Sequence, residues 1–277
     1  MTAFDLLGCI YGKMCVEYRI PALPLRQPGI EMEGEAMAEQ TKGKCKYCGK
    51  EYTKAYMTRH LDSCKERKAV LEAEAGSMRY GYFELVIYGK YDKNYWMVIE
   101  IRDDTTLKVL DGFLRDIWLE CCGHLSAFEI EGVSYETAPD EDNFWGRPVK
   151  DMKYKLKSVL RKGMKVNYEY DFGSTTELII EVRGHRTGGW RKEKLTILSR
   201  NNAPEYLCDK CHKKKAVMLC PQHVYNGEEV FLCEACGAKL GDEEYIWAVC
   251  NSPRMGVCGY EGSEIYPDQF VPDTEKE

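Results

Sequence analysis

Two apolar segments with strand-like composition open the middle of the chain. Tyr82–Tyr88 and Tyr95–Ile101 are rich in aromatic and β-branched residues, which favours β-strands, and residues 89–94 between them suit a hairpin loop. Apolar side chains then recur at helical spacing over Leu107–Trp118. This change from strand-like to helical periodicity predicts an α+β domain, to which we assign residues 78–200.

Shorter segments extend the same pattern to the end of this domain. A short helix is expected at Tyr154–Arg161, because Gly163 follows it as a stop. We therefore expect a central mixed or antiparallel sheet with helices on one side. The remaining strand-like segments are Phe128–Ile130, Val133–Tyr135, Lys165–Asp171, Glu177–Arg183 and Lys194–Leu198.

The spacing of four potential metal ligands predicts a small ββα-type zinc finger over residues 41–70. Cys45 and Cys48 are separated by two residues, and His60 and Cys64 follow with three residues between them. Two thiolates on a tight turn and two ligands one helical turn apart can complete a tetrahedron around zinc. A unit this small cannot fold by burial alone, so metal binding would supply its folding energy.

A second row of ligands predicts a treble-clef-like domain with two zinc ions over residues 204–262. Eight ligands fill two tetrahedral sites and leave no open position, so these ions should not activate water. Together with the finger, the sequence therefore predicts three structural zinc ions. The eight residues are Cys208, Cys211, Cys220, His223, Cys233, Cys236, Cys250 and Cys258.

The pairing of these eight ligands has two solutions. A hairpin around residues 225–228 would bring the first pair of ligands to the third pair, and would leave the second pair to join Cys250 and Cys258. The alternative groups the first four ligands and then the last four. We favour the interleaved solution, although spacing alone leaves both open. His212 is an alternative ligand, but it directly follows Cys211 and more simply points away.

The two ends of the chain carry no sustained periodicity. Residues 1–40 contain prolines and glycines and are expected to be disordered, or to be an over-extended N-terminus, since Met37 stands just before the finger as a natural start. Residues 263–277 form an acidic tail, which we expect to be frayed.

Composition narrows the class of protein. The 277 residues include 30% charged side chains, and no apolar run reaches the roughly 18 residues that span a bilayer, so no membrane contact is expected. The N-terminus lacks the pattern of a secretory signal, which predicts a cytoplasmic protein. In a reducing compartment, 14 cysteines are more readily explained by metal binding than by disulfides.

A local basic stretch stands out against the formal net charge of −6. Residues 42–68 hold nine Lys and Arg residues but only three acidic ones. Lys54, Arg59 and Lys65 lie on or beside the predicted finger helix, where they could meet phosphates of DNA or RNA. A single finger contacts only about three base pairs, so any contact is expected to be weak in sequence specificity.

Four segments of the central domain resemble the plasmid pRiA4b Orf-three-like family, whose members are labelled as mobile-element passenger proteins. They are Tyr95–Ile99, Asp104–Leu107, His124–Ile130 and the spaced pattern that ends in Tyr168-x-Tyr170-Asp171-Phe172-Gly173. The resemblance covers roughly residues 80–185, and members with an N-terminal zinc finger are similar in layout. It implies no particular reaction, because none of these segments is a catalytic motif.

This chain departs from the family at several polar positions. Ser126 stands where the family tends to have a second histidine, and Ser174, Thr176 and Leu178 replace its aspartate, tryptophan and histidine. If that polar cluster is catalytic or binds metal in the family, this chain has lost the function. If the cluster is structural, the fold can accommodate these four changes by repacking the side chains around them.

Three functions are consistent with these patterns. The first is a non-catalytic zinc-binding protein whose finger contacts nucleic acid, and the second is a protein-binding adaptor with purely structural zincs. The third is an uncharacterised enzyme with its site near His124, Tyr168, Tyr170 and Asp171. His124 is more simply a cation at a helix end, where the dipole favours it. The sequence leaves any protein partner and the oligomeric state open.

Overall fold

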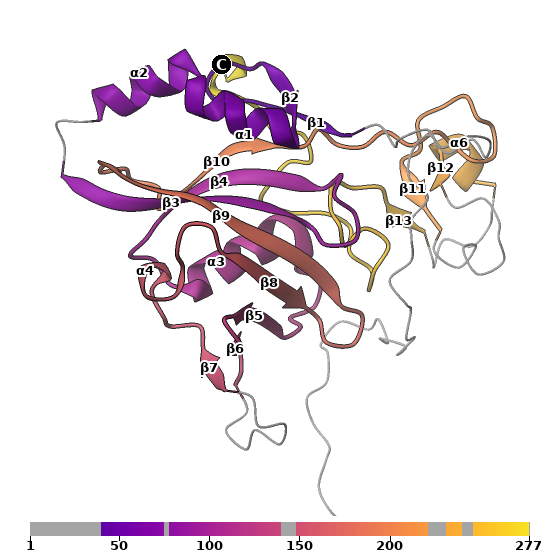
Figure 1. Ribbon diagram of the computed structural model, residues 1–277. Helices are drawn as coiled ribbons and strands as arrows, with labels where there is room; N and C mark the ends of the chain where they lie inside the picture. The colour runs from indigo at the N-terminus through magenta and orange to yellow at the C-terminus, as the bar shows by residue number, and fades with distance from the viewer. Residues whose placement is uncertain (1–39, 75–77, 140–147, 221–230, 240–245, 277) are drawn as a thin grey trace, which may run out of the picture.

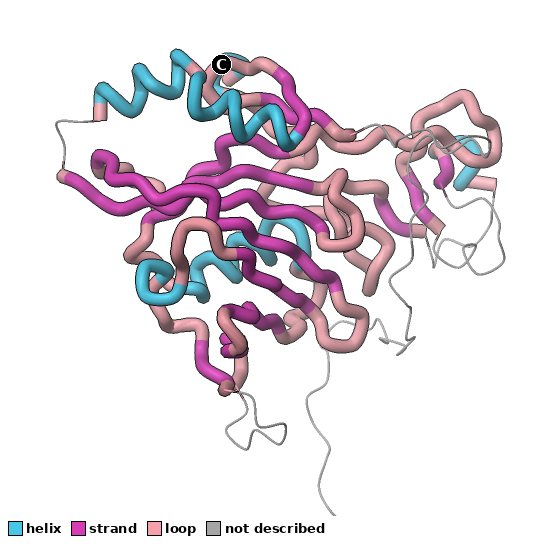
Figure 2. The backbone as a smooth tube through the Cα atoms, viewed as in Figure 1, coloured by secondary structure: helices cyan, strands magenta, loops and turns pink. Residues whose placement is uncertain are grey.

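The computed structural model describes residues 40–74, 78–139, 148–220, 231–239 and 246–276. The expectations for the N-terminal segment up to residue 39, and for His223, lie outside these residues. Within them the chain is α+β, as predicted, and strands outweigh helices (Figure 2). No helix of the described ranges has the length and the apolar character that crossing a bilayer requires.

A mixed sheet of eight strands forms the centre of the molecule, in the order β10-β4-β3-β9-β8-β5-β6-β7 (Figure 1). All neighbours are antiparallel except β6 and β7, which are parallel. The strands are β3 (Arg79–Gly89), β4 (Trp96–Arg102), β5 (Ser126–Ile130), β6 (Val133–Glu136), β7 (Val149–Asp151), β8 (Lys165–Tyr170), β9 (Thr176–Gly189) and β10 (Leu195–Arg200).

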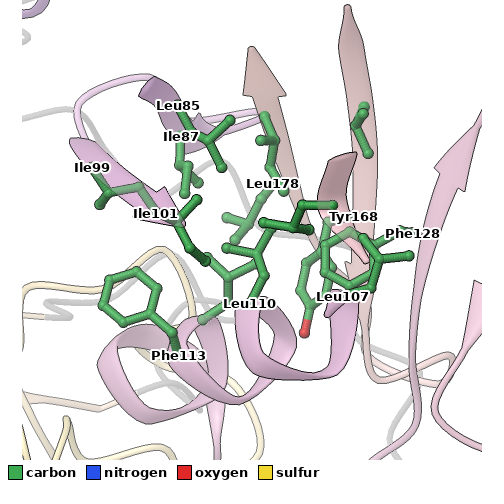
Figure 3. Close-up of a cluster of buried hydrophobic side chains, with 14 of the residues drawn as sticks. Leu85, Ile87, Ile99, Ile101, Leu107, Leu110, Phe113, Phe128, Tyr168 and Leu178 are labelled. Carbon is green, nitrogen blue, oxygen red and sulfur yellow. The ribbon is translucent and has the colours of Figure 1, made fainter. Parts of the chain in front are cut away.

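One face of the sheet is covered by helix α3 (Leu107–Leu114), which continues into a π-helical turn over Arg115–Leu119. Alternate side chains of the central strands point to this face, as the two-residue period of a strand requires, and meet the apolar stripe of the helix. Figure 3 shows the resulting core, with Leu107 and Leu110 facing Leu85 and Ile101. The short helix α4 (Leu156–Val159) completes this layer.

The opposite face is covered by the finger, which consists of β1 (Lys42–Lys44), β2 (Glu51–Thr53), α1 (Lys54–Ser63) and α2 (Lys65–Ala73). Met57 and Leu61 of α1 share one buried cluster with Val86 and Val98 of the sheet. Both faces of β3 and β4 are therefore dry, and helices lie on both sides of the sheet rather than on one (Figure 1).

The described residues of the C-terminal part form a small unit. They include a three-stranded sheet in the order β12-β11-β13 and the short helix α6. Their bounds are β11 (Met218–Leu219), β12 (Phe231–Leu232), β13 (Trp247–Ala248) and α6 (Glu234–Gly237).

The acidic tail packs against the rest of the molecule, in contrast to the frayed end that we expected. Tyr266 meets Phe113 edge to face, with ring centroids 5.6 Å apart. The last turn, Asp273–Glu275, returns to the finger, where Asp273 pairs with Lys46 at 2.8 Å. Opposite charges on the tail and the finger, which are remote in sequence, therefore hold the tail in place. The acidic composition of the tail alone does not predict this contact.

Candidate metal centres

The finger brings together four potential ligands. Cys45 and Cys48 lie on the turn after β1, His60 lies in α1, and Cys64 follows α1, with their ligand atoms all within 4.8 Å of one another. Cys45 Sγ is 4.0 Å from Cys64 Sγ, and Cys48 Sγ is 3.2 Å from His60 Nε2. Tetrahedral zinc with bonds of about 2.3 Å to sulfur and about 2.0 Å to nitrogen separates its ligand atoms by roughly 3.5–3.8 Å. A metal ion therefore fits this cluster.

The surroundings of the cluster orient its histidine. The ring of Tyr52 stacks on His60, with centroids 4.5 Å apart. Burial lowers the pKa of His60 and so favours the neutral imidazole, which is the form that binds metal. Gly49, with φ of 70°, allows the turn between the strands to close by donating its N–H to the carbonyl of Cys45.

A second cluster joins Cys208 and Cys211 to Cys233 and Cys236, again within 4.8 Å. Cys233 directly precedes α6, and its Sγ lies 3.9 Å from that of Cys211. The peptide N–H of Asp209 donates to the carbonyl of Phe231, which draws the two segments together. These are the four residues that the interleaved pairing groups. His212 is exposed, has φ of 51°, and is not a member of the cluster.

The structure groups Cys258 with residues of the central domain. We expected it to join Cys250, Cys220 and His223, but its sulfur lies beside residues of the central domain instead. The turn between Gly256 and Gly259 directs it there, and both glycines have positive φ angles. Cys250 is buried in an apolar cluster with Met255 and other residues.

Cys258 forms a third cluster with Cys121, Cys122 and His124, which follow the π-helical turn. From the sequence, His124 was expected to be a cation at a helix end rather than a metal ligand. The spacing Cys-Cys-x-His was the pattern that could have indicated a metal site. None of the cysteines in the described ranges forms a disulfide. Three Cys/His clusters of the described residues could therefore hold a metal ion.

The two tyrosines of the enzyme hypothesis make contacts inside the domain. The hydroxyl of Tyr168 donates to Asp111 at 2.8 Å, and that of Tyr170 donates to Glu120 at 3.1 Å. Ser126, which stands at the family's second histidine, is fully buried and also donates to Asp111, at 2.6 Å. These contacts fit the reading of the polar cluster as structural.

The basic residues of the finger divide into two groups. Arg67 is 5% exposed and turns inward to Glu84 and Glu100. Lys54 lies over the ring of Tyr88 at 3.7 Å, and burial lowers its pKa. Arg59 and Lys65, in contrast, are exposed. Of the three cations expected to meet phosphates, Lys54 is thus the least accessible.

Part of the central domain matches a known protein family. Residues 88–206 match the family described as Plasmid pRiA4b ORF-3-like protein, which supports the resemblance. A crystal structure of a protein of unknown function from Methanosarcina mazei Go1 is similar with 18% identity and a TM-score of 0.37. That similarity covers 44% of this chain and 69% of the other. No curated protein matches the chain.

The matched span contains only part of the candidate metal sites. The finger cluster and the Cys208 cluster lie outside it, and the third cluster joins three residues inside it to Cys258 outside it. The matched span therefore contains none of the three clusters in full.

Proposed function

We propose that this chain is a non-catalytic zinc-binding protein of the pRiA4b type whose finger contacts nucleic acid. Soft thiolate donors in tetrahedral arrangement suit zinc among the common divalent metals. The clusters around Cys45 and Cys208 each supply four protein donors, so a zinc ion there has no open position for water. Such ions stabilise folded segments rather than catalyse hydrolysis.

The observation that carries the nucleic-acid proposal is an exposed basic and aromatic surface on α1 and α2. We define it by Tyr56, Arg59, Lys65 and Lys68, all of which are exposed. Tyr56 is 60% exposed, and the guanidinium of Arg59 lies 4.4 Å from its ring centroid. Cations beside an exposed aromatic ring suit a phosphate backbone with unstacked bases.

Other cations of the finger are less available for such a contact. Lys44 and Lys46 pair with Glu275 and Asp273 of the tail at 2.8 Å each. The proposed contact is therefore confined to the surface around Tyr56, which is consistent with an acidic chain that binds nucleic acid only locally.

Salt-dependent binding tests the proposal. Each phosphate contact should add about 0.9 to the slope of log K against log salt for duplex DNA, or about 0.7 for a single strand. Replacing Arg59, Lys65 and Lys68 by Ala should lower the affinity for nucleic acid. It should also reduce the magnitude of the slope by the contribution of up to three phosphate contacts. The zinc content should not change, because none of the three belongs to a cluster.

A charge-matched control uses three exposed lysines of the central domain, Lys108, Lys157 and Lys192. Their replacement by Ala changes net charge by the same amount but should leave the slope near that of the parent protein. If the parent protein binds neither DNA nor RNA at low salt, the nucleic-acid proposal fails and the protein-binding adaptor replaces it. An equal loss in both triple variants would show that only net charge matters.

A further inference from the structure

We propose that Cys121, Cys122, His124 and Cys258 bind one zinc ion that fastens the C-terminal segment 249–262 to the central domain. This inference does not depend on nucleic-acid binding by the finger. The site differs from the finger and the Cys208 cluster because its ligands come from two remote parts of the chain. Cys258 is 134 residues away from His124, its partner at 3.4 Å.

The distances among the four donors fit a single tetrahedral ion. Cys122 Sγ lies 3.8 Å from both Cys121 Sγ and Cys258 Sγ. His124 Nε2 lies 2.9 Å from Cys122 Sγ and 3.4 Å from Cys258 Sγ. A zinc ion with bonds of about 2.3 Å to sulfur places sulfur atoms about 3.8 Å apart. Three sulfurs and one nitrogen thus converge on one point and leave no open position.

The backbone turns sharply in both chain segments that supply the four donor atoms. Gly123 has φ of 81°, which turns the chain between Cys122 and His124 so that both side chains face the same place. Cys258 itself has φ of 50°, in a region that residues other than glycine rarely adopt. Such a conformation persists only where surrounding interactions hold it, and it is often found at ligand sites. A metal bond to Cys258 is an interaction of that kind.

A buried arginine provides the outer shell of the site. Arg254 is 0% exposed, donates to Cys121 Sγ at 3.4 Å, and pairs with Asp171 at 2.8 Å. Three thiolates and one zinc ion carry a net charge of −1, so a guanidinium beside a ligand sulfur stabilises the loaded centre. Asp171 also lies 3.5 Å from His124 Nε2. Arg254 belongs to the same segment as Cys258, so the segment brings its own counter-charge.

The segment has other contacts with the domain, which the ion would reinforce rather than replace. Ser252 donates its hydroxyl to the carbonyl of Trp118 at 2.6 Å. Tyr260 and Met255 share a small buried cluster, against which Cys121 packs. The ion should therefore act as a clamp on a segment that is already seated, and its removal should loosen residues 249–262 without unfolding the sheet.

Metal counting in single and double variants tests the assignment. Cys122→Ser and Cys258→Ser should each lose one zinc equivalent, and the double variant should also lose only one, since both residues hold the same ion. Combining Cys258→Ser with Cys208→Ser should lose two equivalents, which shows that the count resolves separate sites. The proposal is overturned if Cys258→Ser keeps all its zinc, or if Cys122→Ser/Cys258→Ser loses two equivalents.

Thiol alkylation of the unmutated protein provides a test that does not depend on the variants folding. Cys122 is exposed, so its sulfur should react slowly with iodoacetamide when zinc is bound and at least tenfold faster after chelation. Peptide mass spectrometry assigns the modified residue. Equal rates before and after chelation, or a disulfide between Cys258 and either neighbouring cysteine in the zinc-loaded protein, would rule the site out.

Discussion

Glu100 is a carboxylate that the sheet places almost entirely out of water, at 1% exposure. Burial alone would raise its pKa, but hydrogen bonds from Arg186 and the charges of Arg67 and Arg191 lower it to about 2. Arg67 reaches Glu100 from α2, at 2.7 Å, so the same carboxylate links the finger to β4. One residue thus connects the charge balance of the core with the docking of the finger.

Replacing Glu100 by Gln should destabilise the protein by about 3–5 kcal/mol, because it leaves the buried Arg67 and the partly buried Arg186 and Arg191 without this charged partner. The pKa of Glu100 is about 2 in the folded state, against 4.5 for an ordinary glutamate. Its charge therefore stabilises the fold above pH 4.5, and this contribution is lost as pH falls from about 4.5 to about 2. Denaturant unfolding measures the free energy of unfolding across this pH range. Between pH 4.5 and 2, that free energy should fall less in the variant than in the parent protein, by on the order of 3 kcal/mol.

Glu131→Gln is the matched control for this charge effect. Glu131 pairs with Arg161 on the surface, where the two side chains are 59% and 64% exposed. Its removal should cost less than about 1 kcal/mol and leave the acid limb unchanged. A Glu100→Gln protein with the parent's stability and acid limb would show that the arginines around it do not need the charge.

At the scale of elements, the finger and the sheet share one apolar core. Strand β1 of the finger approaches β10 of the sheet, where Gly43 forms a bridge with Asn201. Lys46 donates its peptide N–H to the carbonyl of Leu198 at 2.8 Å. A side chain at Gly43 would overlap the backbone carbonyl of Arg200 and the ring of Trp96. The close approach of the two backbones therefore requires glycine at this position.

Gly43→Ala should separate β1 from β10 and cost about 1–3 kcal/mol, because a backbone atom cannot move aside as a flexible side chain can. Hydrogen exchange should accelerate at residues 42–53, while the metal content of the finger stays the same. The control is Gly112→Ala in α3, where an added Cβ meets nothing within 4 Å. That change should be neutral or stabilise by up to about 1 kcal/mol. Unchanged exchange at 42–53 in Gly43→Ala would contradict a tight finger-to-sheet contact.

The elements that the sequence predicts best are those with a strong local pattern. The hairpin of β3 and β4, helix α3 and the grouping of Cys45, Cys48, His60 and Cys64 all follow from short-range spacing. Nearly every residue of Tyr95–Ile101 is apolar, and a strand of this composition is typically buried on both faces of its sheet. The sequence thus already indicated that both faces of this strand are covered. The strand itself was predicted from its aromatic and β-branched residues and not from a two-residue alternation. The position of Cys258 could not be predicted, because its partners are set by how two distant segments pack.

At the scale of the whole molecule, the acidic tail neutralises one edge of the basic finger. Glu275 pairs with Lys44 and Asp273 pairs with Lys46. Asp273 also donates its peptide N–H to the carbonyl of Lys46. The tail thereby occupies two cations that would otherwise be open to solvent beside the proposed nucleic-acid surface.

Given the proposed function, the double variant Asp273→Asn/Glu275→Gln should strengthen binding to nucleic acid, because Lys44 and Lys46 become available to phosphates. The slope of log K against log salt should become steeper by the contribution of up to two phosphate contacts. Filter binding over a range of salt measures both quantities. Glu261→Gln/Glu264→Gln is the control with the same change in net charge, at two exposed positions of the chain. If both double variants strengthen binding equally, the effect comes from net charge and not from release of the two lysines.

The contact between the finger and β10 also has a consequence for the order in which the chain can fold. The finger emerges early during synthesis, yet Asn202, just after β10, donates to Glu51 of the finger across 151 residues of sequence. Contacts of such long range form late, because the intervening chain must first be made and its loop closed. Until the ribosome has released β10, the docking surface for Met57 and Leu61 is incomplete, and a nascent chain of this length exposes apolar surface that favours aggregation or chaperone binding.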